Sequence, residues 1–260
     1  MLAAERHHRI VEMINLRSTV RVTELSDLFS VTEETIRRDL EKLEKEKKLS
    51  RSHGGAIRIQ QTDSEIHFSE REIQNMNEKK AIAEQAIKRV KEGDRIILDA
   101  STTAWYMAKA LPNIPITVIT NSIKILIALG RKDKIEVIST GGKLLPRSLS
   151  YVGPLAERSL DMYHVNKTFI SCKALHLETG PSDSNELQAL LKKRMIQHSD
   201  HVILMIDSSK FDKQAFSLIA AIDDIDEIIT DSLIDQKSIQ ALEKKDIGVT
   251  VVVTKQIADV

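Results

Sequence analysis

The sequence has little of several features that mark common protein classes. Its one cysteine, Cys172, excludes an internal disulfide framework. No stretch approaches the roughly 18 uninterrupted apolar residues of a membrane-spanning helix. Aromatic residues make up only 3% of the chain, which disfavours the stacking surfaces that bind single-stranded RNA. The formal net charge is zero, so overall charge gives no argument for a nucleic acid partner.

The composition that remains is typical of a globular protein. Hydrophobic residues make up 42% and charged residues 29% of the chain, and its 260 positions are enough for one large or two ordinary domains. The first residues, "MLAAERHHRI", carry charge where a secretory signal needs an apolar run. We therefore expect a cytoplasmic protein without a membrane partner or a cofactor. His198 and His201 are spaced as a metal-binding pair could be, but no ligand cluster accompanies them, so we expect no metal.

The charge is unevenly distributed along the chain. Residues 37–58 contain eight Lys or Arg against four acids, a local excess of +4. A solvated helix face laced with ion pairs, such as Glu41 with Lys45, would have the same composition. The neighbouring sequence is needed to choose between that interpretation and a binding surface.

Three helical patterns open the chain. Apolar residues recur at helical spacing within 4–17 and within 23–29, which predicts two short helices. After a short break, Thr32 is a suitable N-cap, and two acids follow at the positive end of the helix dipole. The third helix therefore carries the basic segment. Its predicted buried face consists of Ile36, Leu40 and Leu43.

The segment after the third helix predicts a two-stranded wing. Gly54 and Gly55 form a turn between strand-like residues 49–53 and 56–59. Three helices and a wing make a winged helix-turn-helix unit, whose last helix can lie in the DNA major groove. Arginine and lysine side chains there can reach base edges and phosphates. We expect DNA contacts from Thr32, Glu34, Thr35, Arg37, Arg38, Lys42, Arg51, His53 and Arg58.

The stretch from Arg6 to Ala56 resembles the N-terminal signature of the DeoR family of bacterial transcription regulators. That family pairs a "TIRRDL..LE" helix with an "R.HGGA" wing, and both patterns occur here. The resemblance implies that the domain binds double-stranded operator DNA. Lys48 departs from the family pattern, which usually has glycine at the end of the helix.

The rest of the chain predicts a second domain. Residues 59–76 are polar and lack a sustained period, which indicates a linker with some local helix. Beyond them, helical and strand patterns alternate, which is typical of an α/β domain with a largely parallel sheet. We expect a DNA-binding domain at 1–58, a linker at 59–76 and an α/β effector domain at 77–260.

Polar loops follow three of the predicted strands. In parallel sheets, ligands bind at the carboxyl ends of strands, and hydroxyls, glycines and helix N-termini suit a phosphate. Each loop alone has the composition of an ordinary helix cap, so the prediction depends on several such loops meeting at one edge. "SLSYVG" at 148–153 and "SDSNE" at 182–186 add to them. The expected effector-binding residues are Asp99, Ser101, Thr102, Thr103, Thr120, Asn121, Ser122, Gly141, Gly142 and Lys210.

These positions also resemble the DeoR family, whose effector domain is similar to the ribose-5-phosphate isomerase class of folds and senses phosphorylated sugars. Ser101 departs from that pattern, because it stands where the family's "D.GTT" loop usually has glycine. The stretch "ISCKALH" stands where a "GADGI"-like stretch is usual, so Lys173 replaces an acidic residue. Resemblance to a subgroup of the family implies rhamnulose phosphate as the effector.

Two function classes follow. The first is a homo-oligomeric repressor of a sugar-catabolism operon, whose binding to operator DNA is modulated by a phosphorylated sugar. The alternative is a sugar-phosphate isomerase with a DNA-binding extension, which would need a carboxylate base. The candidate bases are Asp99, Asp183, Glu186 and Asp207. Because Lys173 replaces an acid, we expect the regulator and not the enzyme.

Overall fold

The computed structural model describes residues 3–17, 19–46, 48–52, 54–57 and 65–254. The chain divides into two compact units, Met1–Thr62 and Asp63–Val260, and each is described by itself.

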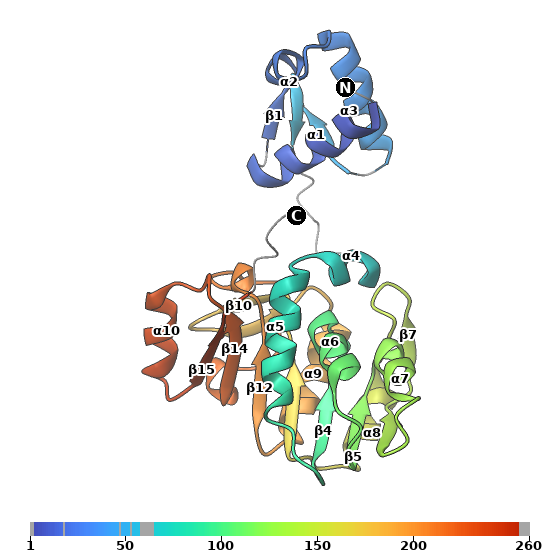
Figure 1. The fold of residues 1–260 in the computed structure, drawn as a ribbon, viewed down its shortest axis with the longest axis vertical. Helices are drawn as coiled ribbons and strands as arrows, with labels where there is room; N and C mark the ends of the chain where they lie inside the picture. Colours follow the sequence, from blue (N-terminus) through green and yellow to red (C-terminus); the bar gives the residue numbers. More distant parts are fainter. Residues whose placement is uncertain (1–2, 18, 47, 53, 58–64, 255–260) are drawn as a thin grey trace. The chain divides into compact units, whose positions relative to one another are not determined.

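The first unit contains three helices and a small antiparallel sheet (Figure 1). The helices are α1 (Ala3–Arg17), α2 (Val22–Phe29) and α3 (Glu33–Lys45), and the strands are β1 (Thr19–Arg21), β2 (Ser50–Ser52) and β3 (Gly55–Ile57). The strand order is β1-β3-β2, so the predicted wing hairpin pairs with β1, which the sequence did not predict. The winged helix-turn-helix prediction is confirmed.

Helix α3 begins and packs as its sequence predicts. The Thr32 hydroxyl accepts a hydrogen bond from the Thr35 backbone N–H and caps the helix. Ile36, Leu40 and Leu43 are buried in a core to which α1 and α2 also contribute. The apolar stripe therefore holds α3 against the unit and leaves its opposite face to the solvent.

A buried ion pair also ties α3 to α1. Arg6 donates from Nε to Oδ2 of Asp39 at 2.6 Å and from Nη2 to Oδ1 at 3.2 Å, and Nε2 of His7 lies 2.8 Å from Oδ1. Burial by itself raises the pKa of Asp39, but the hydrogen bonds and charges of Arg6 and His7 outweigh it and hold that pKa below its ordinary value. The paired carboxylate fixes α3 relative to α1.

The second unit is built on a seven-stranded parallel sheet in the order β15-β14-β12-β9-β4-β5-β6. Its strands are β4 (Arg95–Leu98), β5 (Ile116–Thr120), β6 (Ile135–Ser139), β9 (Lys167–Ile170), β12 (Val202–Met205), β14 (Glu227–Asp231) and β15 (Gly248–Val252). Its helices are α4 (Phe68–Ile73), α5 (Met76–Ile87), α6 (Thr102–Ala110), α7 (Ile123–Leu129), α8 (Pro154–Leu160), α9 (Glu186–Gln197) and α10 (Gln236–Glu243), with short 3₁₀ turns at Ser208–Lys210 and Ile222–Asp224.

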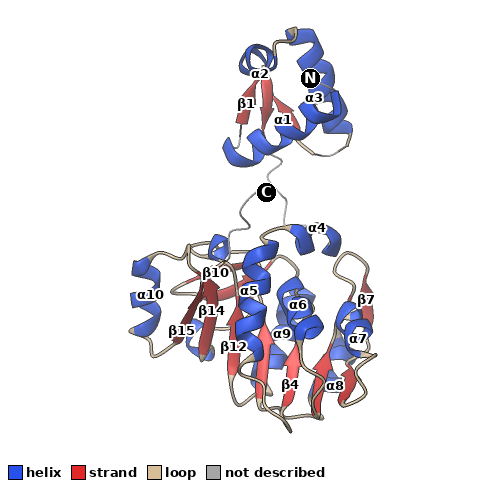
Figure 2. Ribbon diagram, in the orientation of Figure 1, coloured by secondary structure: helices blue, strands red, loops and turns tan. Residues whose placement is uncertain are grey.

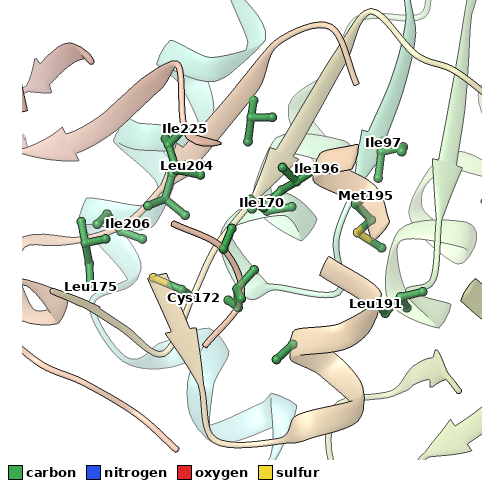
Figure 3. Packing of buried hydrophobic residues seen from close by; sticks show 14 of the residues in the cluster. Ile97, Ile170, Cys172, Leu175, Leu191, Met195, Ile196, Leu204, Ile206 and Ile225 are labelled. Atoms are coloured by element: carbon green, nitrogen blue, oxygen red, sulfur yellow. The ribbon is translucent and has the colours of Figure 1, made fainter. Parts of the chain in front are cut away.

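Helices cover both faces of this sheet (Figure 2). Adjacent residues of a strand point to opposite faces, so Ile96 and Leu98 of β4 pack with α5, α6 and α7, whereas Ile97 packs with α8 and α9. Figure 3 shows the hydrophobic cluster on the face covered by α8 and α9, where Ile97 and Ile170 of the sheet lie near Leu191 and Met195 of α9. This pattern of burial on both faces confirms the predicted α/β class with a parallel sheet.

The second unit also contains two small sheets and part of the predicted linker. The additional strands are β7 (Lys143–Leu145), β8 (Ser150–Val152), β10 (Ala174–His176), β11 (Gly180–Asp183) and β13 (Ser217–Leu218). Residues 59–64 of the predicted linker lie outside the described residues, whereas 65–76 belong to the second unit and include α4. Phe68 accounts for this docking, because it is buried against Trp105 of α6. The exact domain boundaries stay a prediction.

The Asp39 pair gives a test of stability. Replacing Asp39 by Ala leaves Arg6 buried without its partner, so we expect the first unit to lose about 3–5 kcal/mol of unfolding free energy. The pKa of Asp39 is lower in the folded state, so its stabilisation is present above the unfolded value of about 3.9 and is lost as the pH falls through the folded-state value. Urea unfolding at several pH values measures both effects.

The control is Glu41→Ala, which removes an exposed ion pair with Lys45 on the same helix. Exposed pairs contribute about 0.3–0.5 kcal/mol, so this variant should unfold nearly as the original protein does. Equal losses in Asp39→Ala and Glu41→Ala would contradict the structural role of the buried pair.

Candidate functional site

The solvent face of α3 presents most of the residues predicted to contact DNA. Thr32, Glu34, Arg37, Arg38 and Lys42 are exposed, and Thr35 is half-buried. Glu34 and Arg38 lie opposite the buried stripe of the helix, and Thr35, Arg37 and Lys42 lie on its flanks, an arrangement suited to a helix that enters the major groove.

The two arginines of α3 are held differently. Nη2 of Arg37 lies 2.6 Å from Oε2 of Glu33, whereas Nε of Arg38 is 3.4 Å from Oε1 of Glu34. The Arg38 side chain is also the more exposed, at 78% against 50% for Arg37. Arg38 therefore has the weaker competing contact and is the more accessible of the two arginines.

The wing is described only in part. Arg51 is exposed on β2, and its backbone N–H donates to Oε1 of Glu44 at 2.9 Å, which joins the strand to α3. His53 and Arg58, which we also predict to contact DNA, lie outside the described residues.

In the second unit, the predicted effector residues gather at the carboxyl edge of the sheet. Leu98 of β4 pairs with Thr120 of β5 and with Phe169 of β9. Asp99, Asn121 and the residues after β9 therefore follow neighbouring strands at nearly the same level. Lys210 joins them from the loop after β12, where its Nζ donates to Oγ of Ser171 at 2.9 Å.

Most of the hydroxyl groups predicted to bind an effector are buried, and several accept hydrogen bonds from backbone N–H groups. Ser101 accepts from the N–H of Ala104 and caps α6, and Ser122 accepts from the N–H of Ile125 and caps α7. Thr120 accepts from the N–H of Ser122. Thr102 and Thr103 are buried in the first turn of α6. These loops are helix caps as well as candidate ligand loops, so the two interpretations of their sequence are compatible.

The two predicted glycines differ in what they allow. Gly142 has φ +114, and a Cβ there would lie 2.8 Å from the carbonyl oxygen of Val152, so close backbone packing requires glycine. Gly141 has φ +60 and nothing within 4 Å of such a Cβ. Only Gly141 leaves open space for a ligand to approach.

The buried side chain of Lys192 contacts three of the segments that meet at the carboxyl edge of the sheet. Nζ of Lys192, on α9, lies 2.7 Å from Oδ2 of Asp183 and 3.4 Å from Oδ2 of Asp99, and it donates to the carbonyl of Ser171 at 2.7 Å. Burial lowers the pKa of Lys192, but the two carboxylates outweigh it and raise the pKa above its ordinary value. Asp99 also accepts from the N–H groups of Ser101 and Ser171. Asp99 and Asp183, both candidate bases of the isomerase alternative, are thus already committed to hydrogen bonds.

Three cations, Lys210, Lys79 and Arg71, form a second charged cluster at this edge, which we call the cationic group. Oδ2 of Asp207 is 3.8 Å from Nζ of Lys210, and Oδ1 accepts from Nδ2 of Asn75 at 2.8 Å. Lys79 of α5 is buried, and its ammonium donates to the carbonyls of Arg71 and Gln74. Burial, followed by the charge of Lys210, lowers the pKa of Lys79 to about 8.

Arg71 completes this group. It lies on α4, which packs on the N-terminal half of α6 because Phe68 contacts Trp105 at 5.6 Å between ring centres and Tyr106 donates to the carbonyl of Glu72 at 3.0 Å. Nε and Nη2 of Arg71 are buried without a hydrogen-bond partner among the described residues. The Arg71 carbonyl accepts from the Lys79 ammonium, and the guanidinium carbon lies 5.8 Å from the centre of the Phe68 ring.

Sequence reasoning identified Lys210 but missed Arg71, Lys79, Asn75 and Lys192. Arg71 and Asn75 fall in the polar stretch that we assigned to the linker, and Lys79 and Lys192 sit in helices rich in charge. The only available signal was a lysine at a position that the helical period places inside, as for Lys79 near Ile82 and Ala86.

Other candidates have ordinary roles. His198 and His201 contact separate carboxylates, those of Asp161 and Asp226, and no set of three His, Cys, Asp or Glu side chains suited to a metal occurs among the described residues. Cys172 is buried in the hydrophobic cluster of Figure 3, where burial raises the pKa of its thiol to about 11. Among the helices within the described ranges, none is long and apolar enough to cross a membrane.

Comparison with known proteins agrees with both units. Residues 6–62 match the model of the DeoR-like helix-turn-helix domain, and residues 74–232 match that of the DeoR C terminal sensor domain. The chain is 68% identical to the HTH-type transcriptional regulator YulB of Bacillus subtilis (strain 168), over 97% of this chain and 98% of that protein. It is 36% identical to the L-fucose operon activator of Haemophilus influenzae (strain Rd), over 93% and 97%.

Among solved structures, ribose 5-phosphate isomerase A from Methanocaldococcus jannaschii aligns with 53% of this chain and 55% of that chain, at 18% identity and a TM-score of 0.37. The whole-length relatives are named as regulators of transcription and not as enzymes. The chain therefore belongs to the DeoR family: it is a DNA-binding transcriptional regulator with an N-terminal helix-turn-helix domain and a C-terminal sensor domain.

Proposed function

We propose that the protein represses a sugar-catabolism operon and that a phosphorylated sugar, bound at the carboxyl edge of the sensor sheet, modulates its affinity for operator DNA. The proposal includes a cytoplasmic homo-oligomer, since helix-turn-helix proteins commonly read paired half-sites. Repression is the direction that the family resemblance implies. Because one relative is named an operon activator, the tests below measure the sign of the response as well as its size.

The observation that carries the proposal is the cationic group of Arg71, Lys79 and Lys210. Two buried guanidinium nitrogens of Arg71 without a hydrogen-bond partner are costly, and a phosphate oxygen is an acceptor whose geometry suits them. Burial is the main cause of the lowered pKa of Lys79, and the nearby charge of Lys210, which a bound dianion would offset, adds to it. The three cations thus favour a phosphate over an uncharged sugar.

A second observation favours a polyhydroxylated ligand. Nδ2 of Asn121 donates to the carbonyl of Tyr151 at 2.9 Å, which identifies the remaining atom, Oδ1, as an acceptor. Oδ1 is buried without a partner among the described residues, and it follows the strand next to Asp99. A sugar hydroxyl would supply the missing donor once the loop opens to admit it.

A thermal-shift screen tests the ligand class. The panel contains inorganic phosphate, ribose 5-phosphate, fructose 1-phosphate and rhamnulose phosphate, each beside its unphosphorylated sugar. We expect a sugar phosphate to raise the unfolding temperature of the sensor unit and the free sugars to have little effect. If no phosphorylated compound shifts the transition, the proposed sensor site is wrong.

The cationic group gives the first functional prediction. Lys210→Ala and Arg71→Gln should leave operator affinity unchanged without sugar phosphate, but should weaken sugar-phosphate binding by about 10-fold or more, because each removes a charge-assisted hydrogen bond worth about 1.5–3 kcal/mol. Isothermal titration and operator titrations measure the two affinities. Lys237→Ala, at an exposed position of α10, is the control. Undiminished binding in both site variants would place the sensor site elsewhere.

Lys79 gives a prediction about pH. With a pKa of about 8, its ammonium loses its charge as the pH rises from 7 to 9, while a phosphate ester is already a dianion above about pH 6. Sugar-phosphate affinity should therefore fall over this range. Lys79→Arg keeps the charge at every pH in this range and should remove most of the dependence. A profile that is the same for both proteins would exclude Lys79 as the titrating group.

The DNA surface gives a third prediction. Arg38→Ala should cost about 1–3 kcal/mol of operator binding and less on random DNA, because a base contact carries sequence information. Arg51→Ala should weaken binding to operator DNA and to random DNA more evenly, because phosphate contacts do not distinguish sequences. Arg9→Ala is the matched control, since Arg9 makes a similar exposed pair with Glu5 on α1. Equal losses on operator and random DNA would remove Arg38 from the base-reading residues.

A further inference from the structure

The start of the sensor unit is bound to a stretch far along the sequence, Arg147–Tyr151. The N–H of Phe68 donates to the carbonyl of Arg147 at 2.7 Å, and Nη1 of Arg147 donates to the carbonyl of Glu65 at 3.3 Å. Glu65 is the first described residue after the gap at 58–64, so these bonds hold the chain where it enters the sensor unit.

The same stretch is bound to the candidate ligand loop after β5. The N–H of Tyr151 donates to the carbonyl of Asn121 at 2.8 Å, and the N–H of Ile123 donates to the carbonyl of Leu149 at 3.0 Å. Leu149 has φ +51, a left-handed conformation that is unfavourable for a non-glycine residue. The surroundings therefore hold this stretch in an unfavourable conformation, and a change in the ligand loop reaches it directly.

Gln188 lies where these contacts meet. Its Nε2 is 2.8 Å from Oγ of Ser150, 3.0 Å from Oγ of Ser148 and 3.1 Å from Oε1 of Glu65, and the residue is 4% exposed. The Glu65 carboxylate accepts, so the facing atom of Gln188 is the donor. Two amide hydrogens face three acceptors. A shift of Ser150 therefore changes the bond available to Glu65.

Helix α9 carries Gln188 one turn before Lys192. Residues four apart on a helix share a face, so the two side chains project to the same side of α9. Lys192 contacts Asp99 and Asp183 at the floor of the proposed ligand site. One helix thus contacts both the ligand site and Glu65.

We propose that Gln188 is a positioning residue that couples the ligand loop after β5 to Glu65 at the start of the sensor unit. Ligand binding at Asn121 and the cationic group shifts Ser148–Tyr151, and Gln188 passes that shift to Glu65. This inference rests on the proposed function, because it requires a ligand that distinguishes two states of the sensor unit. It assigns Gln188 a role in the response to ligand and none in holding the ligand itself.

The test exchanges the two side chains. Gln188→Glu places a carboxylate against that of Glu65 while the hydroxyls of Ser148 and Ser150 can still donate to it, so the repulsion falls on the contact with Glu65. Glu65→Gln alone keeps an acceptor and is the conservative control. The double variant, Gln188→Glu with Glu65→Gln, restores a donor and an acceptor with their direction reversed.

Two quantities are measured for each full-length protein. Isothermal titration gives the affinities for ribose 5-phosphate, fructose 1-phosphate and rhamnulose phosphate, and operator titrations give the change in DNA affinity that each compound causes. Allosteric coupling is typically about 5- to 150-fold, and we expect the unmodified protein to fall in this range. In Gln188→Glu we expect ligand affinity to stay within a few-fold while the coupling falls to near one. The double variant should recover most of the coupling, and Glu65→Gln should keep it.

The outcomes separate this inference from the proposed function. If the original protein binds none of the three sugar phosphates, the proposed ligand class fails before Gln188 is tested. If it responds and Gln188→Glu responds equally, the inference is wrong. Loss of coupling that the double variant does not restore would also overturn it, because the defect would then lie in α9 itself and not in the contact with Glu65. Thermal unfolding of each variant confirms that the sensor unit is folded.

Discussion

The buried Lys192 ammonium is the charge on which the sensor site depends. A lysine taken out of water must be paired, and Asp99, Asp183 and the Ser171 carbonyl satisfy it together. These partners come from three separate segments of the chain, at the ends of β4, β9 and β11. One ion pair network therefore holds the loops at the carboxyl edge in place, and the same loops carry the groups proposed to bind a ligand.

Helix α4 has a similar role at the rim of this edge. Its burial through Phe68 and Trp105 places the Arg71 guanidinium where two of its nitrogens lack partners. The Phe68 ring, 5.8 Å from the guanidinium carbon, gives Arg71 one favourable contact, and a bound anion would supply the hydrogen bonds that the two nitrogens lack. Because α4 is also the first helix of the sensor unit, the segment that faces the proposed anion is continuous with the segment that enters from the DNA-binding unit.

In the DNA-binding unit the buried charges are paired with one another, and the charges proposed to bind a ligand are exposed. Its one buried charge cluster, among the residues described in that unit, anchors α3 to α1 through Arg6, His7 and Asp39, while the arginines on the far side of α3 stay exposed. Exposed pairs with Glu33 and Glu34 are weak enough for DNA phosphates and bases to displace. A fixed helix with exposed, weakly paired charges on its surface is suited to recognition of a DNA groove.

The sequence by itself determined the elements and the family. Helical spacing, the Thr32 cap and the Gly54-Gly55 turn identified the winged helix-turn-helix, and alternating strand and helix patterns identified the parallel sheet, because these signals are local. Tertiary structure alone decided that Arg71, Lys79, Lys192 and Lys210 lie together at one edge. Asn75 and Lys210, which are 135 positions apart in the sequence, contact the same carboxylate, that of Asp207, only when the sheet forms, and no periodicity along the chain records that contact.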